Sequence, residues 1–167
     1  SSISSTEVTC FGTSTGSATF NVSGGTSPYN YSWQNSQTLF SSNSAMLSNI
    51  PAENYSVIAT DARGCTISGN VTVIQPTLLT ASASVTNVLC YGNSTGAIDL
   101  TVNGGTGPYT YAWSNGATSE DISNLPSGNY SVIVTDNRGC TVTVSKTIVQ
   151  PLAPLSATFT VTDVLCF

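Results

Sequence analysis

The residues of this chain that are best suited to covalent chemistry are its cysteines. Five occur, and they are Cys10, Cys65, Cys90, Cys140 and Cys166. No histidine accompanies them, although histidine is the usual base beside a nucleophilic cysteine or serine and a common zinc ligand. The cysteines are therefore candidates for disulfide bonds rather than for catalysis or metal binding.

The acidic side chains do not converge on a catalytic site. Eight acids are spread along the chain, and the adjacent pair Glu120 and Asp121 faces opposite sides if the backbone is extended. Calcium is the one candidate ion, because Asp61, Asp136 and Asp163 lie near predicted repeat ends. No Asp-x-Asp cluster supplies the several oxygens that calcium needs, so turn formation is the competing interpretation. We expect no enzyme activity and no cofactor.

Composition also excludes two classes of partner. Arg63, Arg138 and Lys146 are the only cations among 167 residues of net charge −5, and nucleic-acid binding needs many side chains that neutralise phosphate. No stretch approaches the ~20 apolar residues of a membrane-spanning helix, so we expect no membrane insertion. The first residues lack the pattern of an export signal, and any such signal is expected outside this sequence.

The chain repeats itself. Cys10-Phe11-Gly12 and the later run Gly24-Gly25-Thr26 recur as Cys90-Tyr91-Gly92 and Gly104-Gly105-Thr106, and both repeats end in Gln-Pro. The period is 80 residues from Cys10 to Cys90 and 76 from Cys90 to Cys166, because the first repeat carries extra Ser/Asn-rich residues at 39–45. We expect repeats at 1–76 and 77–151, and the first strand of a third repeat at 152–167.

Each repeat consists of short apolar/polar alternations separated by turn residues, the pattern of an antiparallel β-sandwich. The second repeat predicts strands at 80–89, 97–103, 109–114, 130–136 and 140–149, with a strand or turn near 120–125. The expected fold is all-β, with tandem immunoglobulin-like sandwiches in an elongated array.

Aromatic residues mark the expected cores. Residues two apart on a strand share a face, which predicts that alternating aromatics on the third strand of each repeat face inward. A tyrosine at the start of the next long strand matches the position of the tyrosine corner of immunoglobulin-like domains. The expected core aromatics are Tyr29, Tyr31, Trp33, Tyr55, Tyr109, Tyr111, Trp113 and Tyr130.

These residues resemble a known family. The run Cys-x-Gly, Gly-Gly-Thr-x-Pro-Tyr-x-Tyr-x-Trp, Asn-Tyr-Ser-Val, Thr-Asp-x-x-Gly-Cys-Thr and Gln-Pro is similar to the SprB repeat of giant gliding-motility adhesins. The resemblance covers both full repeats and the start of the third. It implies an extracellular, cell-surface filament exported by the type IX secretion system, in which such repeats form the stalk.

Two disulfide patterns are open, with free thiols as a third alternative. The simplest pairs Cys10 with Cys65 and Cys90 with Cys140, inside each repeat. In an immunoglobulin-like order, however, the end of the first strand and the start of the last lie at opposite poles, separated by a strand of over ~20 Å, whereas disulfide-bonded Cα atoms lie within ~7 Å. We therefore hypothesise that Cys10 pairs with Cys140 of the next repeat, and that Cys65 and Cys90 bond to further repeats.

The function expected from sequence is a structural stalk that supports surface attachment and gliding motility, with neighbouring repeats of the same chain as partners. Surface glycans or the substratum would be contacted through other regions. One alternative is a carbohydrate-binding module that uses exposed aromatics, with Phe40 as the candidate contact. Another is a linker region of a secreted hydrolase.

Overall fold

The computed structural model describes residues 1–36, 39–42 and 44–161, and for 39–42 it describes the backbone alone. The chain forms two compact units. The first contains Ser1–Ala81, Val102–Thr110 and Val134–Val142, and the second contains the rest of the chain. The first unit thus combines the whole first repeat with the first five residues and two turns of the second.

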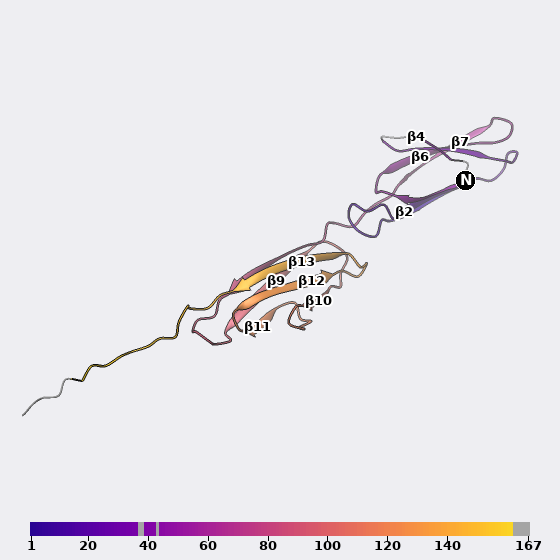
Figure 1. The fold of residues 1–167 in the computed structure, drawn as a ribbon. Coiled ribbons are helices and arrows are strands. Elements are labelled where there is room, and N and C mark those ends of the chain that lie inside the picture. The colour runs from indigo at the N-terminus through magenta and orange to yellow at the C-terminus, as the bar shows by residue number, and fades with distance from the viewer. Residues whose placement is uncertain (37–38, 43, 162–167) are drawn as a thin grey trace, which may run out of the picture. The chain divides into compact units, whose positions relative to one another are not determined.

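The first repeat is a sandwich of two antiparallel sheets (Figure 1). One sheet has the order β1-β2-β5, with β1 at Ser2–Thr6, β2 at Gly16–Asn21 and β5 at Met46–Ile50. The other has the order β4-β3-β6-β7, with β4 at Leu39–Ser42, β3 at Asn30–Gln34, β6 at Asn54–Thr60 and β7 at Thr66–Thr72.

The core of this repeat forms between the two sheets. Trp33 on β3 is fully buried in a cluster that includes Phe20 on β2 and Tyr55 and Val57 on β6. Strand β6 alternates buried and more exposed residues along its length, as a strand with one face on a core must. The amphipathic alternation in the sequence therefore places the sandwich core correctly.

The second repeat has the same order of strands. Its sheets are β11-β9-β8 and β10-β12-β13. The strands are β8 at Thr80–Thr86, β9 at Gly96–Asn103, β10 at Thr110–Trp113, β11 at Ile122–Leu125, β12 at Gly128–Thr135 and β13 at Thr141–Ile148. The expected all-β immunoglobulin-like fold is confirmed, and the described residues contain no helix.

The extra residues of the first repeat extend a sheet. Strand β4 pairs with β3 over Leu39–Ser42, which places Phe40 opposite Trp33 in the register. In the second repeat a tight turn occupies this position, where Gly116 donates to the carbonyl of Trp113 at 2.9 Å. The side chain of Phe40, the candidate glycan contact, lies outside the described residues.

The predicted core aromatics differ in how deeply the structure buries them. The hydroxyls of Tyr55 and Tyr130 each donate to the carbonyl of a proline four residues earlier at 3.1 Å, which is the expected tyrosine corner. The tryptophans are buried, and Tyr31 and Tyr111 are half-buried. The other two tyrosines of the predicted set, Tyr29 and Tyr109, have a different environment.

Tyr29 and Tyr109 do not belong to the buried cores. Each precedes its strand and is half-buried. Their hydroxyls donate to the carbonyls of Gly24 and Gly104 in the preceding glycine turn. A tyrosine with its hydroxyl on a surface turn cannot also direct that end into the core, so these two rings brace the turns instead.

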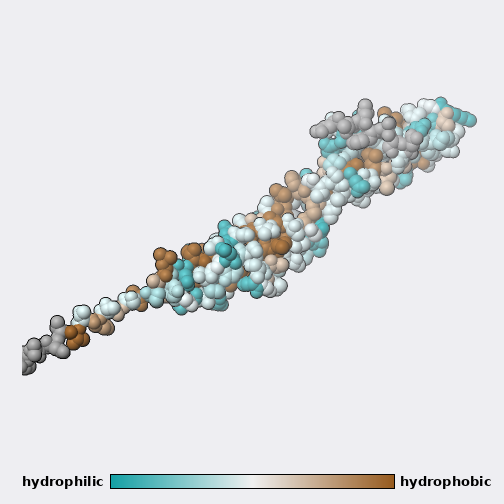
Figure 2. Space-filling view, viewed as in Figure 1, coloured by the Kyte–Doolittle hydropathy of each residue, from teal (hydrophilic) through white to brown (hydrophobic). Residues whose placement is uncertain are grey.

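Residues 152–161 form no strand. The side chains of Leu152, Leu155, Phe159 and Val161 in this segment are almost fully exposed. Elsewhere on the face in view, apolar residues gather in small patches among polar ones (Figure 2). The rest of the proposed third repeat, with Cys166, lies outside the described residues, and the repeat boundaries stay a prediction.

Candidate functional site

The site begins with the loop between the first two strands of each repeat, here called the A–B loop and comprising residues 7–15 and 87–95. In the first repeat Val8 donates its N–H to the carbonyl of Ile74 at 3.0 Å. Gly12 donates to the side-chain oxygen of Gln75 at 2.8 Å. The glutamine of the Gln-Pro ending therefore anchors the loop that carries Cys10.

The other half is the turn between the last two strands, here called the F–G turn and comprising residues 61–65 and 136–140. Asp136 organises it in the second repeat. One carboxylate oxygen accepts from the N–H groups of Arg138 at 2.9 Å and Cys140 at 2.8 Å. The other accepts from Thr106 at 2.9 Å. A short carboxylate that accepts from a backbone N–H two residues later is the expected turn former.

These hydrogen bonds stabilise the ionised carboxylates. Burial alone would raise the pKa of Asp136, but the N–H groups of Thr106, Cys140 and Arg138 and the charge of Arg138 outweigh it, so the pKa lies below its ordinary value. The backbone N–H groups of Thr26 and Cys65 are the main cause of the lowered pKa of Asp61. Both aspartates serve as turn formers.

The two halves meet covalently. Cys10 of the first repeat and Cys140 of the second form a disulfide with an S–S distance of 2.02 Å and a Cα–Cα distance of 5.7 Å. All the residues at this contact belong to the first compact unit. The hypothesised bond between successive repeats is therefore present.

Pairing inside the first repeat is excluded by its own strands. Val8, two residues before Cys10, is bonded to Ile74 just after β7 ends. Cys65 lies just before β7 begins. The seven residues of β7 span about 23 Å at ~3.3 Å per residue, which is far beyond the reach of a disulfide.

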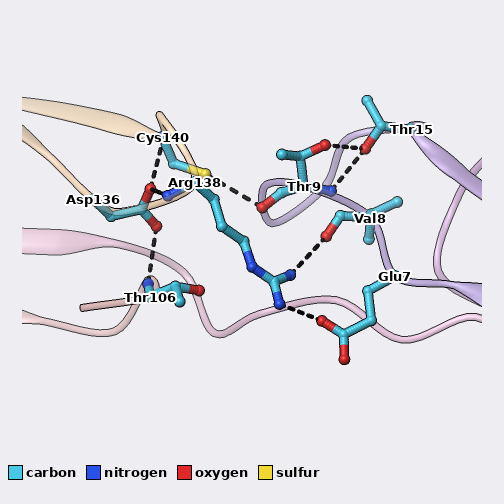
Figure 3. A network of polar contacts seen from close by, with 8 residues as sticks. All are labelled: Glu7, Val8, Thr9, Thr15, Thr106, Asp136, Arg138 and Cys140. Carbon is cyan, nitrogen blue, oxygen red and sulfur yellow. Dashed lines mark hydrogen bonds and ion pairs between the residues drawn. The ribbon is translucent and has the colours of Figure 1, made fainter. Parts of the chain in front are cut away.

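A charged side chain of the F–G turn, that of Arg138, contacts the loop that carries Cys10 (Figure 3). Arg138 donates to the carbonyl oxygen of Val8 at 3.3 Å and forms an ion pair with Glu7. We call these contacts and the Cys10–Cys140 bond the junction. Sequence reasoning missed Glu7 and Arg138. The sequence does contain a signal for this pair. Arg138, one of only three cations, lies two residues before Cys140, and Glu7 lies three residues before Cys10.

The remaining candidates are not brought together. Cys65 and Cys90 are exposed free thiols, and Cys166 lies outside the described residues, as does the calcium candidate Asp163. Within residues 1–36 and 44–161 no group of three metal-ligating side chains occurs. The same part of the chain has no helix long and apolar enough to cross a bilayer.

Comparison with known proteins identifies the repeated segments. The SprB repeat family matches residues 2–38 and 82–118, the first parts of the two repeats. No curated protein matches the chain.

Solved structures with some similarity contain immunoglobulin domains. An amphioxus IgVJ-C2 molecule is 12% identical over 79% of this chain and 94% of that one, with a TM-score of 0.36. The N-terminal four Ig domains of Dscam1 isoform 9.44 are 13% identical over 74% of this chain, also with a TM-score of 0.36. The present chain covers 37% of that Dscam1 structure.

Proposed function

We propose that this chain, whose two repeats match the SprB repeat, is a section of the stalk of a secreted cell-surface adhesin used in surface attachment and gliding. The family match and the immunoglobulin-like fold support an adhesin-type repeat domain, a kind of domain that is typically structural rather than catalytic. Association of the family with cell-surface adhesins suggests an extracellular location, where disulfides persist.

The observation that carries this proposal is the Cys10–Cys140 bond. It closes a loop of 130 residues, which contains most of both repeats. A pulling force applied at the two ends of the chain would pass through the disulfide and bypass the strands inside the loop. The residues inside the loop could then add nothing to the length of the stalk under load, and only the segments outside it, which include β1 and β13, could be pulled away.

Single-molecule stretching of the full chain tests this function. Unfolding in an oxidising buffer should release only the residues outside the loop. Reduction should add the contour length of the 130-residue loop, about 420–460 Å at ~3.3–3.6 Å per residue less the folded Cα–Cα distance of 5.7 Å. A Cys10→Ser control should show the longer extension in both buffers. Equal extension of the parent chain in both buffers would contradict a load-bearing disulfide.

A further inference from the structure

Each repeat has a polar groove on the outer face of one sheet. The first groove has a volume of about 530 Å³ and lies on β3, β6 and β7. Gln34, Ser56 and Asn70 line it and stand directly opposite one another on these three strands, so their side chains share a face. Asn54 and Thr72 form a second such pair beside them. This face points away from the core, because the alternate residues of β6 are the buried ones.

The second repeat has the same groove, with a volume of about 440 Å³. Its polar lining includes Ser114, Asn129, Ser131, Ser145 and Thr147, which correspond in the repeat to the five residues of the first groove. Each groove is lined by residues of one repeat and lies within one compact unit. The segments that follow β7 in the first unit, the junction included, leave the first groove open. The groove is thus a property of the repeat itself.

One hydrogen bond is the same in both grooves. Oγ1 of Thr72 donates to Oδ1 of Asn54 at 2.6 Å, and Oγ1 of Thr147 donates to Oδ1 of Asn129 at 2.7 Å. The bond engages the amide oxygen and leaves the Nδ2 group of the asparagine as a donor. An amide that is already held in place loses little freedom when it binds a ligand.

The lining selects a class of ligand by its chemistry. Hydroxyl and amide side chains both donate and accept hydrogen bonds, as the hydroxyls of a sugar do. Among the described residues that line the two grooves, Lys146 alone carries a charge, and the net charge of −5 for the whole chain repels acidic polymers. The volumes lie within the ~300–1,000 Å³ of clefts that hold small ligands. A segment of a neutral polysaccharide fits these properties.

An apolar side chain adjoins each groove on the same face. Ile58 and Ile133 follow the groove serines by two residues, so they also point outward. They are 49% and 47% exposed. A sugar ring has apolar C–H faces as well as hydroxyls, and contact with such a face would remove the exposed isoleucine surface from water.

The outward residues of this sheet are the same in the two repeats, whereas those of the other sheet are not. The four outward residues of β6 recur on β12, and they are Asn54, Ser56, Ile58 and Thr60, with Asn129, Ser131, Ile133 and Thr135 as their counterparts. On the other sheet Ser17, Thr19 and Asn21 are replaced by Ala97, Asp99 and Thr101. Packing does not require exposed residues to be identical, so binding is the better explanation of the repeated face.

We propose that the two grooves are binding sites for a neutral polysaccharide, one in each repeat. The Nδ2 group of Asn54 or Asn129 donates to a sugar hydroxyl, the hydroxyl of Ser56 or Ser131 bonds another, and the neighbouring isoleucine contacts a ring face. The inference goes beyond the proposed stalk, because it gives each repeat a ligand of its own. It does not involve the junction.

Affinity electrophoresis of the full chain tests the sites. Native gels contain dextran, laminarin or galactomannan as neutral polysaccharides, alginate as an acidic one, or no polysaccharide. The dissociation constant is obtained from the decrease of mobility with polysaccharide concentration. At least one neutral polysaccharide should retard the chain, and alginate should not. No retardation in any neutral gel, or retardation by alginate alone, would overturn the proposal.

The groove is assigned by a pair of matched variants. Asn54→Ala/Asn129→Ala should weaken binding about tenfold, because each groove loses the hydrogen bonds of its amide. Asn21→Ala/Asn103→Ala is the control, since these asparagines are equally exposed but lie on the other sheet of each repeat. It should bind as the parent does. Equal dissociation constants for the two double variants would overturn the assignment, and matching thermal melts show that both are folded.

Two further samples separate this proposal from its alternatives. Size-exclusion chromatography should show a monomeric parent, and a dimer that Asn54→Ala/Asn129→Ala abolishes would mean that the faces bind a second copy of the chain instead. Cys10→Ser should be retarded as the parent is, because each groove lies within one repeat. Its extension under force concerns the stalk alone, so the two proposals fail by different results.

Discussion

The two F–G turns have almost identical hydrogen bonds but differ in solvent exposure. Asp61 accepts from Arg63 at 2.9 Å and Cys65 at 2.8 Å, as Asp136 does from the equivalent residues at the same distances. Arg63 and Cys65 are nevertheless exposed, whereas the equivalent arginine and cysteine are half-buried at the junction. The hydrogen bonds that form the turn thus come from its own repeat, and only the disulfide requires a cysteine from another repeat.

The same contrast holds for the A–B loops. Both are tied to the end of their repeat by one backbone bond and one glutamine. Cys10 is half-buried in a disulfide and Cys90 is exposed and free. Each repeat therefore presents two preformed halves of a junction at opposite ends of its last strand.

The largest effect should come from the cores, which the two repeats share. Trp33→Ala and Trp113→Ala should each lower the free energy of unfolding by about 3–5 kcal/mol, the usual cost of removing a buried aromatic. Thermal unfolding followed by circular dichroism measures this. Ile58→Ala and Ile133→Ala are matched controls on half-exposed strand positions and should change little. An unchanged melting curve for either tryptophan variant would refute the assigned core face.

The next effect separates the bonded from the free cysteines. The double variant Cys10→Ser/Cys140→Ser should lose about 2–4 kcal/mol of unfolding free energy, because the unfolded chain is no longer constrained by the loop. The control Cys65→Ser/Cys90→Ser removes two exposed free thiols and should have almost no effect in denaturant titrations. Equal losses of unfolding free energy in the two double variants would contradict a stabilising role for the Cys10–Cys140 bond.

Acid should weaken both turns in the same direction. The pKa values of Asp61 and Asp136 lie below the ordinary value of 3.8, so the folded state holds these carboxylates ionised more strongly than the unfolded state does. Their contribution is complete above the ordinary pKa and is lost as the pH falls through the lower folded value. Stability should therefore be flat above about pH 5 and fall below about pH 4.

The comparison variant for this pH profile is Asp136→Asn, which cannot ionise. Its unfolding free energy should depend less steeply on pH in the acid range, while it is less stable than the parent at neutral pH. A parent profile that is flat down to pH 2 would contradict the role assigned to the two carboxylates.

The smallest effect concerns the ion pair at the junction. Glu7→Gln removes the partner of Arg138, and both side chains are about one-third or more exposed. Exposed ion pairs contribute little, so the loss should be below about 1 kcal/mol and should shrink further in high salt. A larger loss in urea titrations would mean that Glu7 acts through more than its charge.

Local patterns predicted the sandwich well. Alternation located the strands and both tryptophans, and a tyrosine after a proline corner indicated the Tyr55 and Tyr130 bonds. Strand length favoured pairing of Cys10 with Cys140 over pairing with Cys65, because seven extended residues place the two ends of a strand too far apart for a disulfide. These predictions depend on backbone geometry, which short sequence patterns encode.

Features that depend on contacts between separate segments of the chain were not predictable. The Ser/Asn-rich insertion showed no strand pattern, yet it forms β4 through pairing with β3. The strand positions of Tyr29 and Tyr109 suggested burial, although their hydroxyls bond the glycine turns.

Non-reducing peptide mapping of the full chain by mass spectrometry decides whether successive repeats are covalently stapled. We expect a peptide that joins Cys10 to Cys140, with Cys65 and Cys90 recovered as free thiols in the monomer. Peptides that join Cys10 to Cys65 and Cys90 to Cys140 would contradict the stapled stalk. They would show that each repeat is closed on itself and that no disulfide connects one repeat to the next.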